Sequence, residues 1–483
     1  MNRLFCLMVT GCLLLWAPVS FSTESGRGLT KEGPVTNEVG LELPSIFSDH
    51  MILQRGKEIR VWGRATPGEK VIVKFAGQCV SAVSENGEWE AVLSPVPAGG
   101  PYDLTVICRD VVLTCTNVMV GEVWVCAGQS NMMYPLKLTE KADQDIPSAD
   151  YPLVRYFYQD TVRDSMPRFD VKNGRWVAIS PETVADFGAV PFYFGTKLHD
   201  AMNVPVGLIN VAVGATAIQA HMSAQTLKAV ASLSKGSYEY DSAVYYSMIK
   251  PVQPYVNSGV LWYQGEANSA RNELFEYKGM LSELIDAWRA DWRDPVLPFI
   301  LVQLPGYHEN TIYKWPVLRE GYVDLISEKE NVGMVVSIDT GLEDNIHPPQ
   351  KKIIGSRLTD TALEMVYGDG SPCKSPLFKE MLIRGDRVVL SFDNSGNGFL
   401  IEGDDNILGF EVCGEDQLFF SASGRFSGGN QIEVWSDDVS KPVAVRYAWE
   451  QLPKVNVYNK EGFPLCPFRT DRFDPNTKKC RHK

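Results

Sequence analysis

The sequence predicts an α/β protein with a three-layer α/β/α domain around a parallel sheet, flanked by two β-sandwich-like domains. From Val118 onward, apolar strands alternate with amphipathic helices, a pattern typical of a parallel sheet with helices on both faces. Residues 41–118 and the chain after Gly368 contain only short strands separated by turns. We therefore expect a signal peptide at 1–22, an N-terminal β domain at 23–117, a hydrolase domain at 118–370 and a C-terminal β domain at 371–483.

The first residues have the features of a secretory signal. Arg3 precedes a continuous apolar run from Leu4 to Val19, and small polar residues follow from Ser20 to Thr23. This order predicts cleavage near Ser22 and export to the periplasm or the extracellular space. No later run is apolar and long enough for a transmembrane helix, so we expect no membrane insertion.

The charge of the chain limits its partners. The formal net charge is −13, and removal of Arg3 with the leader makes it −14, which argues against nucleic acid and anionic lipid. A small anionic substrate remains open, because screening confines surface charge to about 8 Å and an arginine in a pocket can dominate there. The oligomeric state is not set by the sequence.

The cysteines favour disulfides over metal. Of ten cysteines, Cys6 and Cys12 lie in the predicted leader, and no CxxC pair or Cys/His spacing resembles a zinc site. We expect Cys108 to pair with Cys115 across a hairpin and Cys466 to pair with Cys480. Cys126 is expected to pack as a small apolar residue in its strand.

The N-terminal β region is expected to form a small sandwich. Its clearest strands run over Ile59–Trp62, Val71–Phe75 and Trp89–Leu93, separated by turns such as Asn86-Gly87. For His50, which precedes the first clear strand, we expect a structural role.

The central domain has strands that end in chemically useful residues. The run Val123–Cys126 leads to Ser130, the strand Val206–Val213 to Gly214, and the strand Gly259–Tyr263 to Asn268. Phe299–Leu304 is a further strand, and Val332–Ile338 leads to Asp344 and His347. Helices with an apolar face are expected around Phe194 and Leu198, around Leu281 and Trp288, and around Ile354 and Leu358.

These residue types meet the requirements of a serine hydrolase. A serine hydroxyl needs an imidazole to take its proton, and a carboxylate holds that imidazole in the correct tautomer. The sequence predicts Ser130 as nucleophile, His347 as base and Asp344 as the orienting acid. The backbone N–H groups of Ser130 and Gly214 and the Asn268 amide are the candidate oxyanion donors. The alternative for Ser130 is a helix cap, and Gly214 and Asn268 considered singly are better explained as turn residues; the functional interpretation depends on their occurring together at successive strand ends.

Three stretches, GEVWVCAGQSNM, LWYQGEAN and DNIHPPQK, resemble the sialate O-acetylesterase family of the SGNH hydrolases. The resemblance extends to LPSIFSDHMILQR near the start and NKEGFPLCPFRTD near the end. It implies an SGNH-hydrolase-like domain flanked by β domains, acting on O-acetyl groups of sialic acid or other sugars without a metal or other cofactor. Ser130, Gly214, Asn268, Asp344 and His347 match the family's site positions.

The resemblance also has departures. Where the family shows a second glycine, then Glu and Trp, this chain has Ala215, Gln219 and His221, which puts the choice of sugar in doubt more than the hydrolysis. Further candidates, as substrate contacts or as supports of the catalytic residues, are Gln129, Gln264, Glu266 and His221.

Three functions remain open from the sequence: a sialate O-acetylesterase, an O-acetylesterase of other glycans such as acetylxylan, and a non-catalytic glycan-binding protein on the same fold. The C-terminal region is expected to form a second sandwich with strands at Met381–Ile383, Arg387–Phe392 and Gln431–Trp435. It could bind glycan or support the hydrolase domain.

Overall fold

The computed structural model describes residues 40–474 except 235, 237–240, 272, 309–313, 370–373 and 404. The predicted signal peptide lies outside these residues. The domain boundaries given above remain predictions. Along the described chain no helix combines the length and apolar character needed to cross a membrane.

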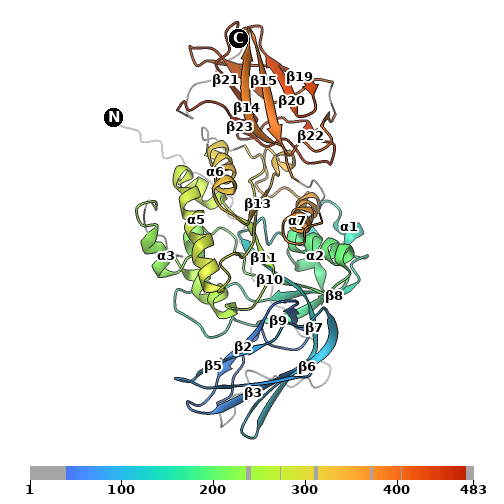
Figure 1. Cartoon of the computed structure of the whole chain (residues 1–483), viewed down its shortest axis with the longest axis vertical. Coiled ribbons are helices and arrows are strands. Elements are labelled where there is room, and N and C mark those ends of the chain that lie inside the picture. Colours follow the sequence, from blue (N-terminus) through green and yellow to red (C-terminus); the bar gives the residue numbers. More distant parts are fainter. Residues whose placement is uncertain are drawn as a thin grey trace, which may run out of the picture. The chain divides into compact units, whose positions relative to one another are not determined.

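The central sheet has seven strands in the order β13-β12-β11-β7-β10-β8-β9 (Figure 1). All neighbouring pairs are parallel except β8 and β9, which pair antiparallel at one edge. The strands are β7 (Val111–Gly128), β8 (Tyr151–Tyr158), β9 (Arg175–Ile179), β10 (Val206–Asn210), β11 (Gly259–Tyr263), β12 (Phe299–Val302) and β13 (Val332–Val335).

Helices cover both faces of this sheet, so the predicted α/β fold class is confirmed (Figure 1). The helices α2 (Ala189–Met202) and α7 (Lys351–Met365) pack together on one side, and α5 (Leu274–Asp291) and α6 (Lys314–Glu328) pack together on the other. Shorter helices are α1 (Ala142–Asp145), α3 (Ala224–Ala229) and α4 (Glu266–Ala270). The predicted apolar faces are buried, because Phe194, Leu198, Leu281, Trp288, Ile354 and Leu358 are all in the core.

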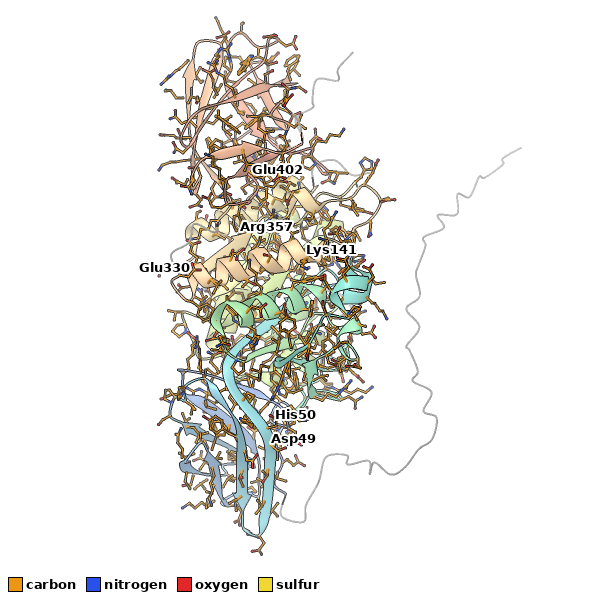
Figure 2. All side chains as sticks on the ribbon, turned by 90° about the vertical axis from the view of Figure 1, so that its right-hand side faces the viewer. Asp49, His50, Lys141, Glu330, Arg357 and Glu402 are labelled. Atoms are coloured by element: carbon orange, nitrogen blue, oxygen red, sulfur yellow. The ribbon has the colours of Figure 1, made fainter. Side chains whose placement is uncertain are left out.

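Strand β7 belongs to two sheets. Its first half pairs antiparallel with β6 (Gly99–Cys108), and its second half pairs parallel with β10 and β11. Figure 2 shows it as one continuous strand running from the N-terminal β region into the central domain. The burial pattern changes in the same way, from partly alternating before Val118 to fully buried from Val118 to Gly128, because the second half is covered on both faces.

The N-terminal β region contains the predicted strands. They are β1 (Ile52–Gln54), β2 (Ile59–Arg64), β3 (Lys70–Phe75), β4 (Gln78–Val83) and β5 (Glu88–Leu93), with β2 and β5 forming a separate pair. His50, labelled in Figure 2, has the structural contacts expected of it: its carbonyl accepts from Arg155 Nη1 at 2.7 Å and its Nδ1 contacts Asn117 Nδ2 at 2.8 Å.

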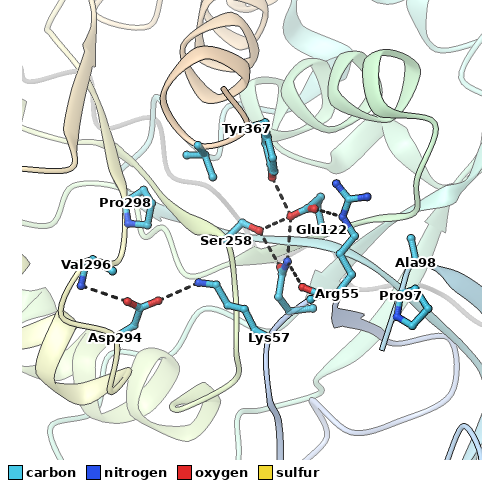
Figure 3. A pocket seen from close by; sticks show the side chains of 13 residues that line it. Arg55, Lys57, Pro97, Ala98, Glu122, Ser258, Asp294, Val296, Pro298 and Tyr367 are labelled. Carbon is cyan, nitrogen blue, oxygen red and sulfur yellow. Dashed lines mark hydrogen bonds and ion pairs between the residues drawn. The ribbon is translucent and has the colours of Figure 1, made fainter. Parts of the chain in front are cut away.

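A buried carboxylate joins this region to the central sheet. Glu122, which begins the parallel half of β7, accepts hydrogen bonds from Gln54, Arg55, Ser258 and Tyr367 (Figure 3). A hollow of about 490 Å³ lies beside this cluster. These residues lie near the start of the parallel half of β7 and the start of β11, and Ser130 follows the other end of β7.

The C-terminal region is built from antiparallel sheets. One contains β14 (Leu377–Arg384), β15 (Arg387–Asp393), β20 (Gln431–Trp435) and β19 (Ser423–Gly428). The other contains β18 (Phe419–Ser421), β17 (Phe410–Cys413), β21 (Ala444–Tyr447) and β23 (Phe468–Arg469), and β16 (Phe399–Ile401) pairs with β22 (Val457–Asn459).

The predicted disulfide between Cys108 and Cys115 is wrong. In the hairpin, Cys108 pairs with Val111 and Cys115 pairs with Leu104, so the two cysteines are not opposite each other. Both are free, as is Cys466, whose predicted partner Cys480 lies outside the described residues. Cys126 is fully buried in β7, as expected, and burial raises the pKa of its thiol.

Candidate active site

Ser130 and His347 meet at the carboxyl edge of the central sheet. Ser130 follows β7, and His347 lies in the loop between the short 3₁₀ helix Ile338–Thr340 and α7. The distance from His347 Nε2 to Ser130 Oγ is 2.7 Å, and both residues are partly exposed. This is hydrogen-bonding reach for transfer of the serine proton to the imidazole.

Glycine at 128 sets the position of Ser130. Its φ is +125°, and a Cβ added there would lie 2.1 Å from the Tyr263 carbonyl oxygen of β11. The chain then turns, because Gln129 N–H donates to the same carbonyl and the N–H groups of Met132 and Met133 donate back to the Gln129 carbonyl. The two strands therefore come close together directly before the serine.

Its surroundings keep the imidazole of His347 neutral. Burial lowers the pKa of His347, and the ammonium of Lys351 lowers it further. The Tyr134 ring stacks against the imidazole with 6.2 Å between centroids, and the backbone N–H of His347 donates to Asn345 Oδ1 at 2.8 Å. A neutral imidazole is the form that accepts a proton, so the ring is available as a base at neutral pH.

Asp344 is not beside His347. Its side chain is exposed, and within the described part of the chain it makes no hydrogen bond to His347. The next residue, Asn345, turns its side chain inward and accepts a hydrogen bond from the backbone N–H of His347, not from its ring. The spacing of three residues predicted a contact that the structure does not show.

The backbone N–H groups of Ser130 and Gly214, the predicted oxyanion donors, have no hydrogen-bond acceptor among the described residues. Gly214 lies close to the nucleophile, because a Cβ added to it would be 3.6 Å from Ser130 Cβ. Two unsatisfied N–H groups beside a nucleophilic oxygen suit the charge that develops in ester hydrolysis.

Asn268 is not a third donor in this structure. It is fully buried, and its amide hydrogens go to Gln219 Oε1 at 3.0 Å and Glu273 Oε2 at 2.8 Å. Its Oδ1 accepts from Ile218 N–H and Gln264 Nε2. The amide therefore connects loops beneath the site, contrary to the prediction.

The remaining predicted residues are buried and bind other protein groups, so they do not form an exposed surface for substrate; they are Gln129, Gln264, Glu266 and His221. Gln264 donates to Gln129 Oε1 at 3.0 Å, and both are buried. Glu266 is buried and accepts from Asn131 Nδ2 at 2.5 Å, and burial raises its pKa. His221 is fully buried against Trp262, with its Nε2 3.1 Å from Thr216 Oγ1, and burial lowers its pKa to about 3. His221 is therefore a core residue and not a substrate contact.

Three residues at the site were missed from the sequence. Asn131 and Lys351 lie inside two of the motifs quoted above, but those motifs gave them no role. Arg163 lies in the irregular segment between β8 and β9, is exposed, and donates from Nη2 to the Gly214 carbonyl at 2.6 Å. Nothing in its local sequence marks it. The described residues hold no group of three or more His, Cys, Asp or Glu side chains arranged for a metal ion.

Comparison with known proteins identifies the family. Residues 120–364 match the family model described as carbohydrate esterase, sialic acid-specific acetylesterase. The sialate O-acetylesterases of mouse and human are 28% and 27% identical to this chain over 86% of its length, covering 90% and 88% of theirs.

A solved structure agrees in fold as well as in sequence. A carbohydrate acetylesterase from Xanthomonas citri is 32% identical, covers 90% of this chain and 100% of its own, and superposes with a TM-score of 0.84. These matches confirm the family resemblance inferred from the three motifs. The chain is therefore an enzyme that belongs to the carbohydrate esterase family of sialic acid-specific acetylesterases.

Proposed function

We propose that this enzyme removes O-acetyl groups from sialic acid through an acyl-enzyme on Ser130. The observation that carries the mechanism is the 2.7 Å contact between Ser130 Oγ and His347 Nε2. Ser130 Oγ attacks the acetyl carbonyl while His347 takes its proton, and the N–H groups of Ser130 and Gly214 bind the oxyanion. The proton then passes to the departing sugar hydroxyl, and water, activated by His347, releases acetate.

Asp344 is the proposed orienting acid of this mechanism. The imidazolium that forms during the reaction lies near the Lys351 ammonium, so a carboxylate beside it would offset two neighbouring positive charges. Asp344 shares the loop of His347 and reaches it only if its side chain turns inward. Asp344→Asn should then lower kcat by about 10⁴. A loss under tenfold would remove Asp344 from the mechanism.

A cation beside the nucleophile favours an acidic sugar. Arg163 is exposed and donates to the carbonyl of Gly214, whose N–H is one of the proposed oxyanion donors. A guanidinium can bind a carboxylate through two parallel hydrogen bonds, and sialic acid carries a carboxylate whereas xylan does not. We therefore assign recognition of the sugar carboxylate to Arg163. Mouse and human relatives are named sialate O-acetylesterases, which agrees with this assignment.

Acetate release tests the reaction and its substrate together. The parent enzyme should release acetate faster from O-acetylated sialic acid than from acetylated xylan, and Ser130→Ala should lower the rate by about a millionfold. Arg163→Ala should raise KM for the sialic acid ester about tenfold and leave the xylan ester unchanged. Equal rates on both substrates, with no effect of Arg163→Ala, would point to an O-acetylesterase of neutral glycans.

We also propose that the protein is exported after removal of the leader. The support is the order of Arg3, the apolar run and the small residues near Ser22 in the sequence. The mass of the protein secreted by its own cells should correspond to a start near residue 23. A mass that includes Met1 would contradict export by this signal.

A further inference from the structure

Beneath the site lies a buried lysine that the proposed reaction does not use. Lys351, the first residue of α7, is 1% exposed, and none of the described carboxylates lies within 4 Å of its ammonium. Its Nζ donates to Asn131 Oδ1 at 2.5 Å and lies 5.0 Å and 5.5 Å from the ring centroids of Tyr134 and Tyr263. Burying an ammonium without a directly paired carboxylate is costly, so such a residue in an enzyme site calls for a functional reason.

Asn131 connects this lysine to both halves of the site. It directly follows Ser130, and its Nδ2 donates to Glu266 Oε1 at 2.5 Å and to the Ile346 carbonyl at 3.1 Å. Ile346 directly precedes His347. One amide therefore holds the ammonium, the buried carboxyl of α4 and the loop of the imidazole, all next to the nucleophile.

Every charged or titratable group near His347 can be named. Ser130 and Tyr134 approach it from the segment after β7, and Lys351 approaches it from α7. Glu266 acts on Lys351 from α4 and reaches the His347 loop only through Asn131. Glu343 and Asp344, in the histidine's own loop, are exposed and make no described bond to it. Arg163, from the segment between β8 and β9, lies beside Ser130, where it donates to the Gly214 carbonyl. Among the described residues, Lys351 is the charged group that lowers the pKa of His347.

We propose that Lys351 is a positioning residue of the esterase site, whose ammonium, held by Asn131, keeps His347 in its neutral base form as the pH falls. This inference rests on the proposed role of His347 as the base. Burial lowers the pKa of Lys351 to about 7, and burial together with the Lys351 ammonium lowers the pKa of His347. While Lys351 carries its proton, its charge opposes protonation of the neighbouring imidazole.

The consequence is activity in mild acid. A histidine base loses activity as the pH falls through its own pKa, so a lower pKa moves that loss to a lower pH. Lys351→Met removes the charge and keeps an unbranched side chain of similar length. The acid limb of the pH profile should then move upward by about one pH unit, which is the size of shift that one nearby charge typically gives. Since Lys351 is not placed against substrate, KM should change little.

The experiment measures the rate at which a fluorophosphonate inactivates the full-length protein between pH 4 and 9. This probe reports the reactivity of Ser130 whatever the natural sugar is. Lys351→Arg keeps the charge and should keep the parent's acid limb. Lys352→Met is the matched control, because Lys352 is the next residue of α7 but is exposed and paired with Asp145. Its acid limb should coincide with that of the parent.

The outcomes separate this inference from the proposed function. If the probe fails to label the parent enzyme, the serine mechanism itself is wrong. If it labels the parent and the acid limb of Lys351→Met coincides with that of Lys352→Met, the proposed role of Lys351 is wrong. If Lys351→Met does not fold, the comparison is made between the parent and Lys351→Arg by following the ¹H–¹⁵N signals of the His347 ring with pH. Because arginine keeps the charge, the His347 ring should titrate at the same pH in both proteins. A raised His347 pKa in Lys351→Arg would contradict the proposal.

Discussion

At the level of single residues, the hydrogen-bond partners of each side chain decide what it can do at the site. Ser130 and Gly214 follow the ends of β7 and β10, and His347 lies in the connection from β13 to α7; parallel strands bring their carboxyl ends to one edge, so the proximity of these residues was predictable. Asn268 also follows a strand, but Gln219 and Glu273 take its amide hydrogens. Gln219 is one of the positions where this chain departs from its family, so a motif alone could not reveal that bond.

The buried histidine His221 predicts an acid-sensitive stability. The pKa of His221 is about 3 in the folded protein and about 6.5 in the unfolded chain, so between these values only the unfolded chain binds the proton. Stability from this residue is full above pH 6.5 and falls by about 1.4 kcal/mol per pH unit as the pH falls toward 3.

Urea unfolding at pH 6.5 and pH 5.0 measures this effect. When the pH is lowered from 6.5 to 5.0, the free energy of unfolding of the parent should fall by about 2 kcal/mol more than that of His221→Gln, because glutamine does not titrate. Equal falls in both proteins would show that His221 already carries its proton or is accessible in the native state.

At the level of elements, apolar patterning predicted the positions of the strands that are buried on both faces and of the helices that pack against them. The strand at Gly259–Tyr263 has the predicted limits, and the predicted Val206–Val213 is shortened to Val206–Asn210. Strands β8 and β9 were not predicted, because Pro152 and Arg155 interrupt the apolar run of β8 and β9 is an antiparallel edge strand. Arg163 lies in the connection between them, which explains why sequence reasoning missed it.

The close approach of β7 and β11 predicts that Gly128→Ala inactivates the enzyme. The added Cβ would overlap the Tyr263 carbonyl, and φ of +125° is unfavourable for alanine, so the strand end and Ser130 must move. Acetate release should fall at least a hundredfold, since a displacement of about 1 Å can cost that much. Gly321→Ala in α6 is the control, because its Cβ meets only Lys278 Cβ at 3.5 Å; it should keep full activity.

At the level of the whole molecule, within residues 40–474, buried arginines connect the central domain to the C-terminal region. The sequence predicted these two regions but no contact between them. Arg319 of α6 is fully buried and donates to the carbonyls of Leu304 and Pro305 after β12 and of Glu450 and Gln451 in the C-terminal region. Arg357 of α7, labelled in Figure 2, pairs with Asp339, which also accepts from Tyr458. These contacts connect the C-terminal region to the loops of the central domain.

This arrangement predicts a large stability loss for Arg319→Met. Two buried and two part-buried carbonyls would lose their donor, and each such loss typically costs about 1 kcal/mol, so the free energy of unfolding should fall by about 3 kcal/mol. Arg293→Met is the control, because Arg293 pairs with Glu90 at the surface, where a pair contributes about 0.5 kcal/mol. Equal losses in the two variants, measured by urea unfolding, would show that Arg319 does not hold the C-terminal region in place.

The central claim is that Ser130, activated by His347, is the nucleophile of an acetylesterase. Its most direct test is to treat the protein with a fluorophosphonate and identify the modified residue by tandem mass spectrometry. The structure predicts stoichiometric modification of Ser130 in the parent and almost none in His347→Ala, because the imidazole must take the serine proton. Modification at another residue, or equal labelling of Ser130 with and without His347, would contradict the account.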